Sequence, residues 1–175
     1  MDEVTHLALA ARGGDRVGLS RFIRATQADV WRFCAHLASP AEADDLTQDV
    51  YLRAMGALDA FRGDSSARTW LLAIARRVVA DHVRRLRRDR RGTPLPLTRS
   101  VGGPTLHGEL SAALRALDAD RHSAFVLTQV LGLSYAETAA VCGCPVGTIR
   151  SRVARARADL VAFLDEGGQG VERRR

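Results

Sequence analysis

Apolar residues recur every three or four positions along most of the chain, and the alternation typical of β-strands is absent. The pattern predicts an all-α protein made of two small helical domains. In the first domain we expect helices over 4–12, 17–38 and 66–91, together with one that starts at Pro40. Trp31 and Cys34 extend the apolar face of 17–38, so we expect both side chains in the core.

The helix that starts at Pro40 combines a cap with a group of acids. Ser39 and Glu42 fit a capping box, and proline suits the first helical position. The next two turns carry Asp44, Asp45 and Asp49. Acids favour the positive end of a helix dipole, but an acidic surface cannot face phosphate. The group is therefore either an ordinary helix start or a surface for a protein partner, and the residues alone leave both interpretations open.

The helix predicted over 66–91, with Asp64 or Ser65 as its cap, becomes strongly basic toward its end. Six of the eight residues in 84–91 are arginine. Cations at a helix C-terminus interact favourably with the dipole, but this density exceeds that need. Nucleic-acid phosphate is the natural partner of such a surface.

Residues 92–108 lack a helical period and hold three of the five prolines of the chain. We interpret them as a flexible linker between a first domain, 1–91, and a second domain, 109–165. The last residues, 166–175, are glycine-rich and charged, and we expect them to be disordered.

The stretch from Leu133 to Arg157 has the features of a helix-turn-helix. Ser134 and Glu137 fit a capping box, Gly143 can take the left-handed conformation that ends a helix, and Pro145 suits the start of the next one. That second helix carries Arg150, Arg152, Arg155 and Arg157 around a buried seam of Ile149 and Val153. Two short helices with a basic second member place side chains in the major groove of DNA.

Composition narrows the class of function. The formal net charge is +6 and the pI is about 10.4, as expected for a nucleic-acid partner. The start of the chain shows no secretory signal, and no run approaches the roughly 20 apolar residues that cross a bilayer. Three cysteines do not suit a disulfide framework. We therefore expect a cytoplasmic protein without membrane insertion.

Three motifs in this order resemble the extracytoplasmic-function (group 4) sigma factors of bacterial RNA polymerase, most of all the compact two-domain actinobacterial type. Residues 44–54, DDLTQDVYLRA, are similar to region 2.2 of that family. Residues 61–85 are similar to regions 2.3 and 2.4, and residues 132–157 to region 4.2. The resemblance covers nearly all of 20–164 and implies a sigma factor that binds core RNA polymerase and directs promoter-specific initiation of transcription.

The resemblance also implies roles for single residues. Core polymerase would be bound by Asp44, Asp45, Gln48 and Asp49. The −10 promoter element would be contacted by Arg68, Arg76, Arg77, Arg84 and Arg85. The −35 element would be contacted by Thr148, Arg150, Ser151, Arg152, Arg155 and Arg157. Of these, Arg150, Ser151 and Arg155 would lie at base edges or adjacent phosphates. Arg152 and Arg157 would contact the DNA backbone or the polymerase flap. Two departures leave base preference open: Arg77 stands where many members have asparagine, and Ala154 where bulkier residues are frequent.

Two other functions fit parts of the sequence. A stand-alone helix-turn-helix regulator would dimerise on a palindrome, but the acidic helix and the first domain would then have no role. A redox- or metal-responsive regulator would depend on Cys142 and Cys144 alone. No catalytic, cofactor-binding or metal-binding pattern is present in the sequence, so we expect no enzyme. The free protein is expected to be monomeric, and the sequence leaves open whether an anti-sigma partner exists.

Overall fold

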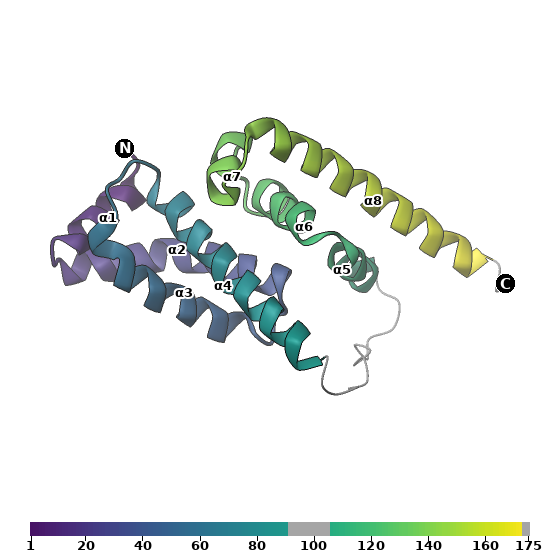
Figure 1. Cartoon of the computed structure of the whole chain (residues 1–175), viewed down its shortest axis with the longest axis horizontal. Coiled ribbons are helices and arrows are strands. Elements are labelled where there is room, and N and C mark those ends of the chain that lie inside the picture. Colours follow the sequence, from purple (N-terminus) through teal and green to yellow (C-terminus); the bar gives the residue numbers. More distant parts are fainter. Residues whose placement is uncertain (91–105, 173–175) are drawn as a thin grey trace.

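The computed structural model describes residues 1–90 and 106–172 of the chain, which form helices joined by short turns (Figure 1). The first domain contains α1 (Glu3–Arg12), α2 (Arg16–Leu37), α3 (Ala43–Ala57), the 3₁₀ turn η1 (Leu58–Ala60) and α4 (Ala67–Arg90). The second contains α5 (Leu106–Ala116), α6 (Ala119–Phe125), the π-helical turn η2 (Val126–Val130), α7 (Tyr135–Cys142) and α8 (Val146–Glu172). The predicted all-α, two-domain fold is confirmed.

The start of α3 differs from the prediction. The helix begins at Ala43 rather than Pro40, and Glu42 makes no capping bond with its side chain to the helix backbone. The Glu42 carboxylate instead accepts from the Ser39 hydroxyl at 2.7 Å and lies 2.7 Å from Nε2 of His82 on α4. The predicted capping box does not form, because the helix begins later and the N–H of Glu42 donates to the carbonyl rather than the hydroxyl of Ser39. The Glu42 carboxylate joins α3 to α4 instead.

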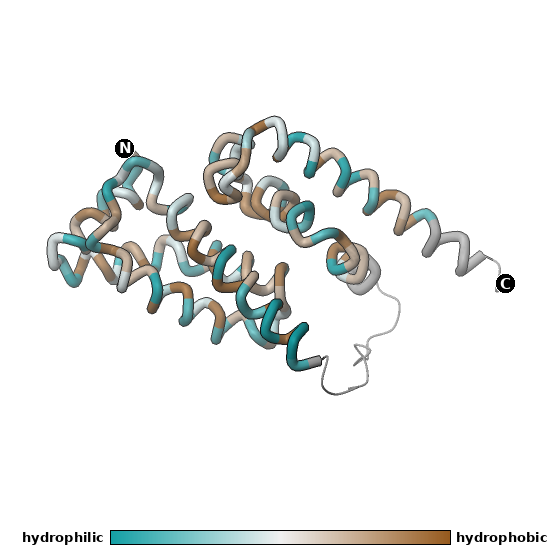
Figure 2. Tube along the Cα trace, viewed as in Figure 1, coloured by the Kyte–Doolittle hydropathy of each residue, from teal (hydrophilic) through white to brown (hydrophobic). Residues whose placement is uncertain are grey.

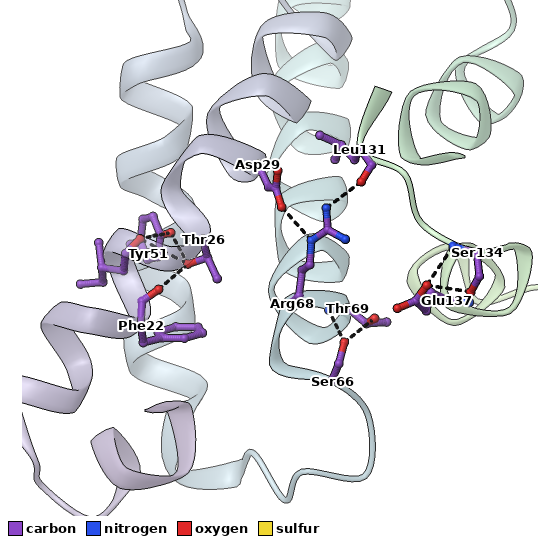
Figure 3. Close-up of polar contacts among 11 residues, drawn as sticks. Phe22, Thr26, Asp29, Tyr51, Ser66, Arg68, Thr69, Leu131, Ser134 and Glu137 are labelled. Carbon is purple, nitrogen blue, oxygen red and sulfur yellow. Dashed lines mark hydrogen bonds and ion pairs between the residues drawn. The ribbon is translucent and has the colours of Figure 1, made fainter. Parts of the chain in front are cut away.

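The start of α4 also differs from the prediction. Its cap is Ser66, whose Oγ accepts from the backbone N–H of Thr69 at 3.1 Å (Figure 3). Asp64 and Ser65 stay outside the helix in an exposed loop. The first backbone N–H of the helix, that of Ala67, donates to the hydroxyl of Thr5 on α1 at 2.9 Å. The helix start thus combines a local cap, one residue after the predicted Ser65, with a partner distant in sequence, which local capping rules do not reveal.

The core of the first domain lies between α2, α3 and α4. Its largest fully buried side chains include Phe22 and Phe33 of α2, Val50 of α3, and Leu71 and Leu72 of α4. Complete burial of a side chain of this size stabilises the fold by about 1.5–3 kcal/mol. Two hydroxyls, those of the buried Thr26 and the half-buried Tyr51, lie 2.7 Å apart beside this core and join α2 to α3 (Figure 3).

Two predictions for α2 had opposite outcomes. Cys34 is fully buried, as predicted. Trp31 is not a core residue: 39% of it is exposed, and its Nε1 donates to Asp44 Oδ1 at 2.8 Å. The indole sits at the edge of the apolar stripe, where its ring can leave the core while its N–H finds a carboxylate.

In the second domain, α8 packs across α5, α6 and α7. Ile149 and Val153 of α8 are buried against Ala124 and Ala139, as the predicted seam requires. The helix extends to Glu172, and the disorder expected for 166–175 stays a prediction. The glycines there lower helix propensity by about 1 kcal/mol each but leave helical dihedrals accessible.

The start of the second domain lies earlier than the sequence indicated. Because α5 begins at Leu106, the last three residues of the predicted linker 92–108 are helical. Leu106 stands four residues before Leu110, so the helical period already begins there. The rest of the predicted linker and residues 173–175 of the predicted tail fall outside the described residues.

The two domains are packed against each other, with α7 beside α4 (Figure 1). Leu127, Leu131, Leu133 and Val141 from the second domain are buried in the same hydrophobic cluster as the core of the first. The end of α4 lies away from this contact and is strongly hydrophilic (Figure 2). The packing brings surfaces far apart in sequence into contact, and several candidate functional residues lie between them.

Candidate functional site

The helix-turn-helix forms as the sequence indicated. Ser134 and Glu137 make the complete capping box at the start of α7, with the Glu137 carboxylate accepting from the Ser134 N–H at 2.8 Å and from its hydroxyl at 2.7 Å (Figure 3). These bonds hold the pKa of Glu137 below its usual value. Gly143 ends α7 with φ 65° and ψ 40°, and α8 follows directly after Pro145. This turn fixes the angle at which α8 presents its outer face.

The arginines on the outer face of α8 form two groups: Arg150 and Arg155 are free in solvent, whereas Arg152 and Arg157 are engaged, that is, bound to another side chain. Arg150 and Arg155 are exposed with Ser151, while Thr148 is half-buried. Arg152 is half-buried, because its Nη2 lies 2.5 Å from Asp120 Oδ2 on α6. Arg157 is exposed, but it donates to Gln129 Oε1 at 2.8 Å. These two engaged arginines are the ones that the resemblance assigns to the DNA backbone or the polymerase flap, and that assignment stays a prediction.

The arginines of α4 are divided in the same way. Arg77, Arg84 and Arg85 are exposed, while Arg68 and Arg76 are half-buried between the domains. Arg68 donates through Nε to Asp29 Oδ2 and through Nη2 to the carbonyl of Leu131, both at 2.7 Å (Figure 3). The three exposed arginines can reach phosphate in this arrangement, although Arg84 also pairs with Asp81 one turn earlier on the same helix. Arg68 and Arg76 are instead bound to partners that include residues of the second domain.

One carboxylate joins the two basic helices. Asp120 accepts from Arg76 Nη2 of α4 at 2.8 Å through one oxygen, and from Arg152 of α8 through the other. The sequence analysis missed this residue. Asp120 lies in the first turn of α6, where acidic residues are common in any helix, so its position alone did not indicate a link between the domains.

The acidic residues of α3 lie on its outer side. Asp44, Asp45 and Gln48 are exposed and Asp49 is half-buried, while Ala43, Leu46, Val50 and Ala54 face the core. The same outer side continues into two exposed apolar side chains, Leu52 (61% exposed) and Met55 (43% exposed). The sequence analysis missed these two residues. Their spacing of four and seven residues from Gln48 places them on the same face of the helix, and this signal could have identified them.

An open groove of about 400 Å³ borders this side of α3. Trp31 and Arg32 of α2 line it together with Asp44 and Thr47 of α3. Acids beside exposed apolar side chains are typical of a surface that binds a protein. We call the set of Trp31, Asp44, Asp45, Gln48, Asp49, Leu52 and Met55 the α3 surface.

The cysteines do not support a redox or metal function. Burial raises the pKa of Cys142 to about 11, which suppresses the reactive thiolate. Among the residues that the structure describes, no three His, Cys, Asp or Glu side chains are grouped as metal ligands. In the same part of the chain, no helix is long and apolar enough to cross a membrane.

Comparison with known proteins identifies both halves. The family model "Sigma-70 region 2" matches residues 22–89, and "Sigma-70, region 4" matches 107–160. The ECF RNA polymerase sigma factor SigC of Mycobacterium tuberculosis is 52% identical over 168 residues, which cover 92% of this chain and 91% of that protein. The ECF RNA polymerase sigma-E factor of Escherichia coli is 31% identical, with 82% and 85% covered.

Solved structures agree with this assignment. The sigma factor RpoE of Bartonella quintana, in complex with the anti-sigma factor NepR, has a TM-score of 0.71 at 30% identity and covers 84% of this chain and 96% of its own. CnrH, in complex with the cytosolic domain of CnrY, has a TM-score of 0.74 at 27% identity, with 94% and 99% covered. The chain therefore belongs to the extracytoplasmic-function sigma factors of the sigma-70 family: it is not an enzyme, and it directs promoter-specific initiation of transcription by RNA polymerase.

Proposed function

We propose that this sigma factor works through three surfaces: the α3 surface binds core RNA polymerase, α4 contacts the −10 element, and α8 contacts the −35 element. The first domain thus comprises 1–91 and the second 109–165, extended to include the start of α5. The stand-alone regulator is not favoured, because the first domain matches a sigma-70 region that it would not need.

The proposal that the α3 surface binds core polymerase rests on the composition of that surface. Asp44, Asp45 and Asp49 repel DNA phosphate, so their partner is a protein. Charge complementarity calls for basic residues on the polymerase, and Leu52 and Met55 supply apolar area for a stable contact. The bond from Trp31 holds the Asp44 carboxylate in place at the edge of the groove.

For DNA, the exposure of single arginines supports different roles. Arg150 and Arg155 with Ser151 point outward from α8 and are suited to base edges or adjacent phosphates. Arg152 and Arg157 are held by Asp120 and Gln129, so we assign them to the DNA backbone or the polymerase flap.

On the −10 side, Arg77 and Arg85 are exposed and can contact phosphate directly, and Arg84 can do so by exchanging its exposed ion pair with Asp81. Arg76 becomes available only when α6 moves away from α4, because its partner Asp120 lies in the second domain. Arg68 would lose its bond to Leu131 in the same movement but would keep its ion pair with Asp29 of α2. We therefore propose that the packed arrangement belongs to the free chain and that the domains separate when both promoter elements are bound.

We place the protein in the cytoplasm, where polymerase and promoter DNA are found. The structure of RpoE was solved with an anti-sigma factor, and we propose that a protein of that class binds this chain as well.

The test of the α3 surface is charge reversal at Asp45. Because Asp45 is exposed, Asp45→Arg leaves the fold intact, and we expect it to abolish co-purification with core polymerase. The control is Asp165→Arg, a reversal at an exposed acid on α8, which should bind core normally. Unchanged binding by Asp45→Arg would count against the assignment of this surface.

A further inference from the structure

The loop between η1 and α4, residues 61–66, is held at both ends by α1. Arg12 Nη1 donates to the carbonyl of Phe61 at 2.8 Å. At the other end, the backbone N–H of Ala67 donates to Thr5 Oγ1 at 2.9 Å, and this bond is buried. Thr5 is itself held, because its hydroxyl donates to Asp2 Oδ2 at 2.6 Å and its backbone N–H donates to Asp2 Oδ1 at 2.9 Å.

The body of the loop is also fixed. Phe61 is 4% exposed, and its ring packs on Trp70 of α4 with centroids 4.8 Å apart and planes tilted by 38°. Gly63 has φ 78°, which favours glycine, and a Cβ built there would lie 3.5 Å from Leu9 of α1. The backbone of the loop therefore rests on α1 in one conformation.

Between these anchors the loop exposes only polar side chains. Arg62, Asp64 and Ser65 are exposed and offer a guanidinium, a carboxylate and a hydroxyl. These groups hydrogen-bond to base edges, and a carboxylate next to DNA can accept from a base amino group but not from phosphate. A rigid loop with such side chains is suited to reading bases, since hydrogen-bonded discrimination needs groups held to within about 0.5 Å.

We propose that Thr5 and Arg12 of α1 are positioning residues, which hold the loop 61–66 in the conformation that discriminates bases of the −10 element. The inference rests on the proposed function of this part of the chain. It assigns α1 a role in promoter specificity, although neither residue needs to touch DNA.

The experiment uses the full chain with core polymerase, on a promoter that the wild-type protein initiates from and on derivatives with each −10 or −35 base substituted. A mismatch in a specific site ordinarily weakens binding roughly 5- to 150-fold. We expect Arg12→Ala and Thr5→Val to reduce −10 discrimination by roughly tenfold, the value of a hydrogen bond to a charged or buried group. Discrimination at −35 and affinity for core polymerase should stay within about twofold of the wild-type values.

Two control variants separate positioning from a general loss of stability. Thr5→Ser keeps the hydroxyl and should retain full −10 discrimination. Arg21→Ala removes an exposed arginine that pairs with Glu3 on α1 but does not reach the loop. This variant should change discrimination at neither the −10 nor the −35 element. Arg12 is exposed, so Arg12→Ala keeps the test decisive even if Thr5→Val does not fold.

Unchanged −10 discrimination in folded Arg12→Ala would overturn the inference, and so would an equal loss at −10 and −35. A wild-type protein without promoter-specific initiation would overturn the proposed function instead, so the two failures are distinguishable.

Discussion

Arg76 of α4 reaches across the domain boundary to Asp120 of α6, with Nη2 2.8 Å from Oδ1. The same carboxylate also holds Arg152, so a single acid occupies one arginine from each predicted DNA-binding helix. Repulsion between the two guanidinium groups is relieved by the shared carboxylate. Asp120 thus links the packing of the domains to the availability of two DNA contacts.

Neutralising this carboxylate should loosen the domain contact. The Asp120 side chain is 43% exposed, so each ion pair contributes no more than about 1 kcal/mol after solvent screening. We expect Asp120→Asn to strengthen binding of the free chain to promoter DNA by roughly 2- to 10-fold and to increase its radius of gyration in solution X-ray scattering. Asp159→Asn, which breaks the pair with Arg121 within the second domain, is the matched control. Equal affinity and equal size for both variants would contradict the role of Asp120.

Arg150 and Arg157 should behave differently although both lie on α8. If Arg150 makes a bidentate base contact, Arg150→Ala will cost about 1–3 kcal/mol and relax sequence preference at one position of the −35 element. Arg157→Ala should weaken binding to all sequences alike. Competition binding with a set of single-base −35 variants measures both effects. A uniform loss for Arg150→Ala would make that residue a phosphate contact instead.

The apolar part of the α3 surface should matter as much as its charge. Leu52 is 61% exposed, and burial of that exposed part against a partner would contribute about 1–2 kcal/mol. We expect Leu52→Glu to weaken binding to core polymerase by roughly 10-fold or more without changing thermal stability. Val17→Glu places the same charge on a valine that is 68% exposed at the start of α2 and should bind core normally. If both variants bind like the wild type, Leu52 lies outside the interface.

His122 gives the fold a defined sensitivity to acid. The residue is 5% exposed, and its Nε2 has no hydrogen-bond partner among the described residues. Burial lowers its pKa to about 4, with the charges of His36 and Arg115 acting in the same direction. Because the folded state favours the neutral imidazole, the contribution to stability is complete above the unfolded pKa of about 6.5 and is lost as pH falls toward 4.

The size of this effect can be isolated by substitution. The difference between the folded and unfolded pKa corresponds to on the order of 3 kcal/mol between pH 7 and pH 4. Thermal unfolding of the wild type should therefore lose more stability over this range than that of His122→Leu. The same loss in both proteins would show that other groups cause the acid sensitivity.

Most local features of the fold could be predicted from the sequence, apart from the start of α3, and the long-range ones could not. The capping box of Ser134 and Glu137 and the seam of Ile149 and Val153 depend on spacing within one helix, and both are confirmed. The start of α4 was predicted to within one residue, but the bond from its first N–H to Thr5, 62 residues earlier, could not be. The partners of Arg68 and Arg76 could not be found either, since Leu131 and Asp120 are brought to α4 only by the packing of the two domains.

We propose that this chain brings core polymerase to promoters through two DNA contacts. Run-off transcription from a genomic promoter library, with purified core and with or without the protein, tests it most directly. We predict initiation that requires the protein and is confined to promoters sharing two sequence elements. Arg150→Ala should impair recognition of the upstream (−35) element, and Arg84→Ala should impair binding at the downstream (−10) element. Initiation that is equal without the protein, or that shows no common elements, would contradict the account.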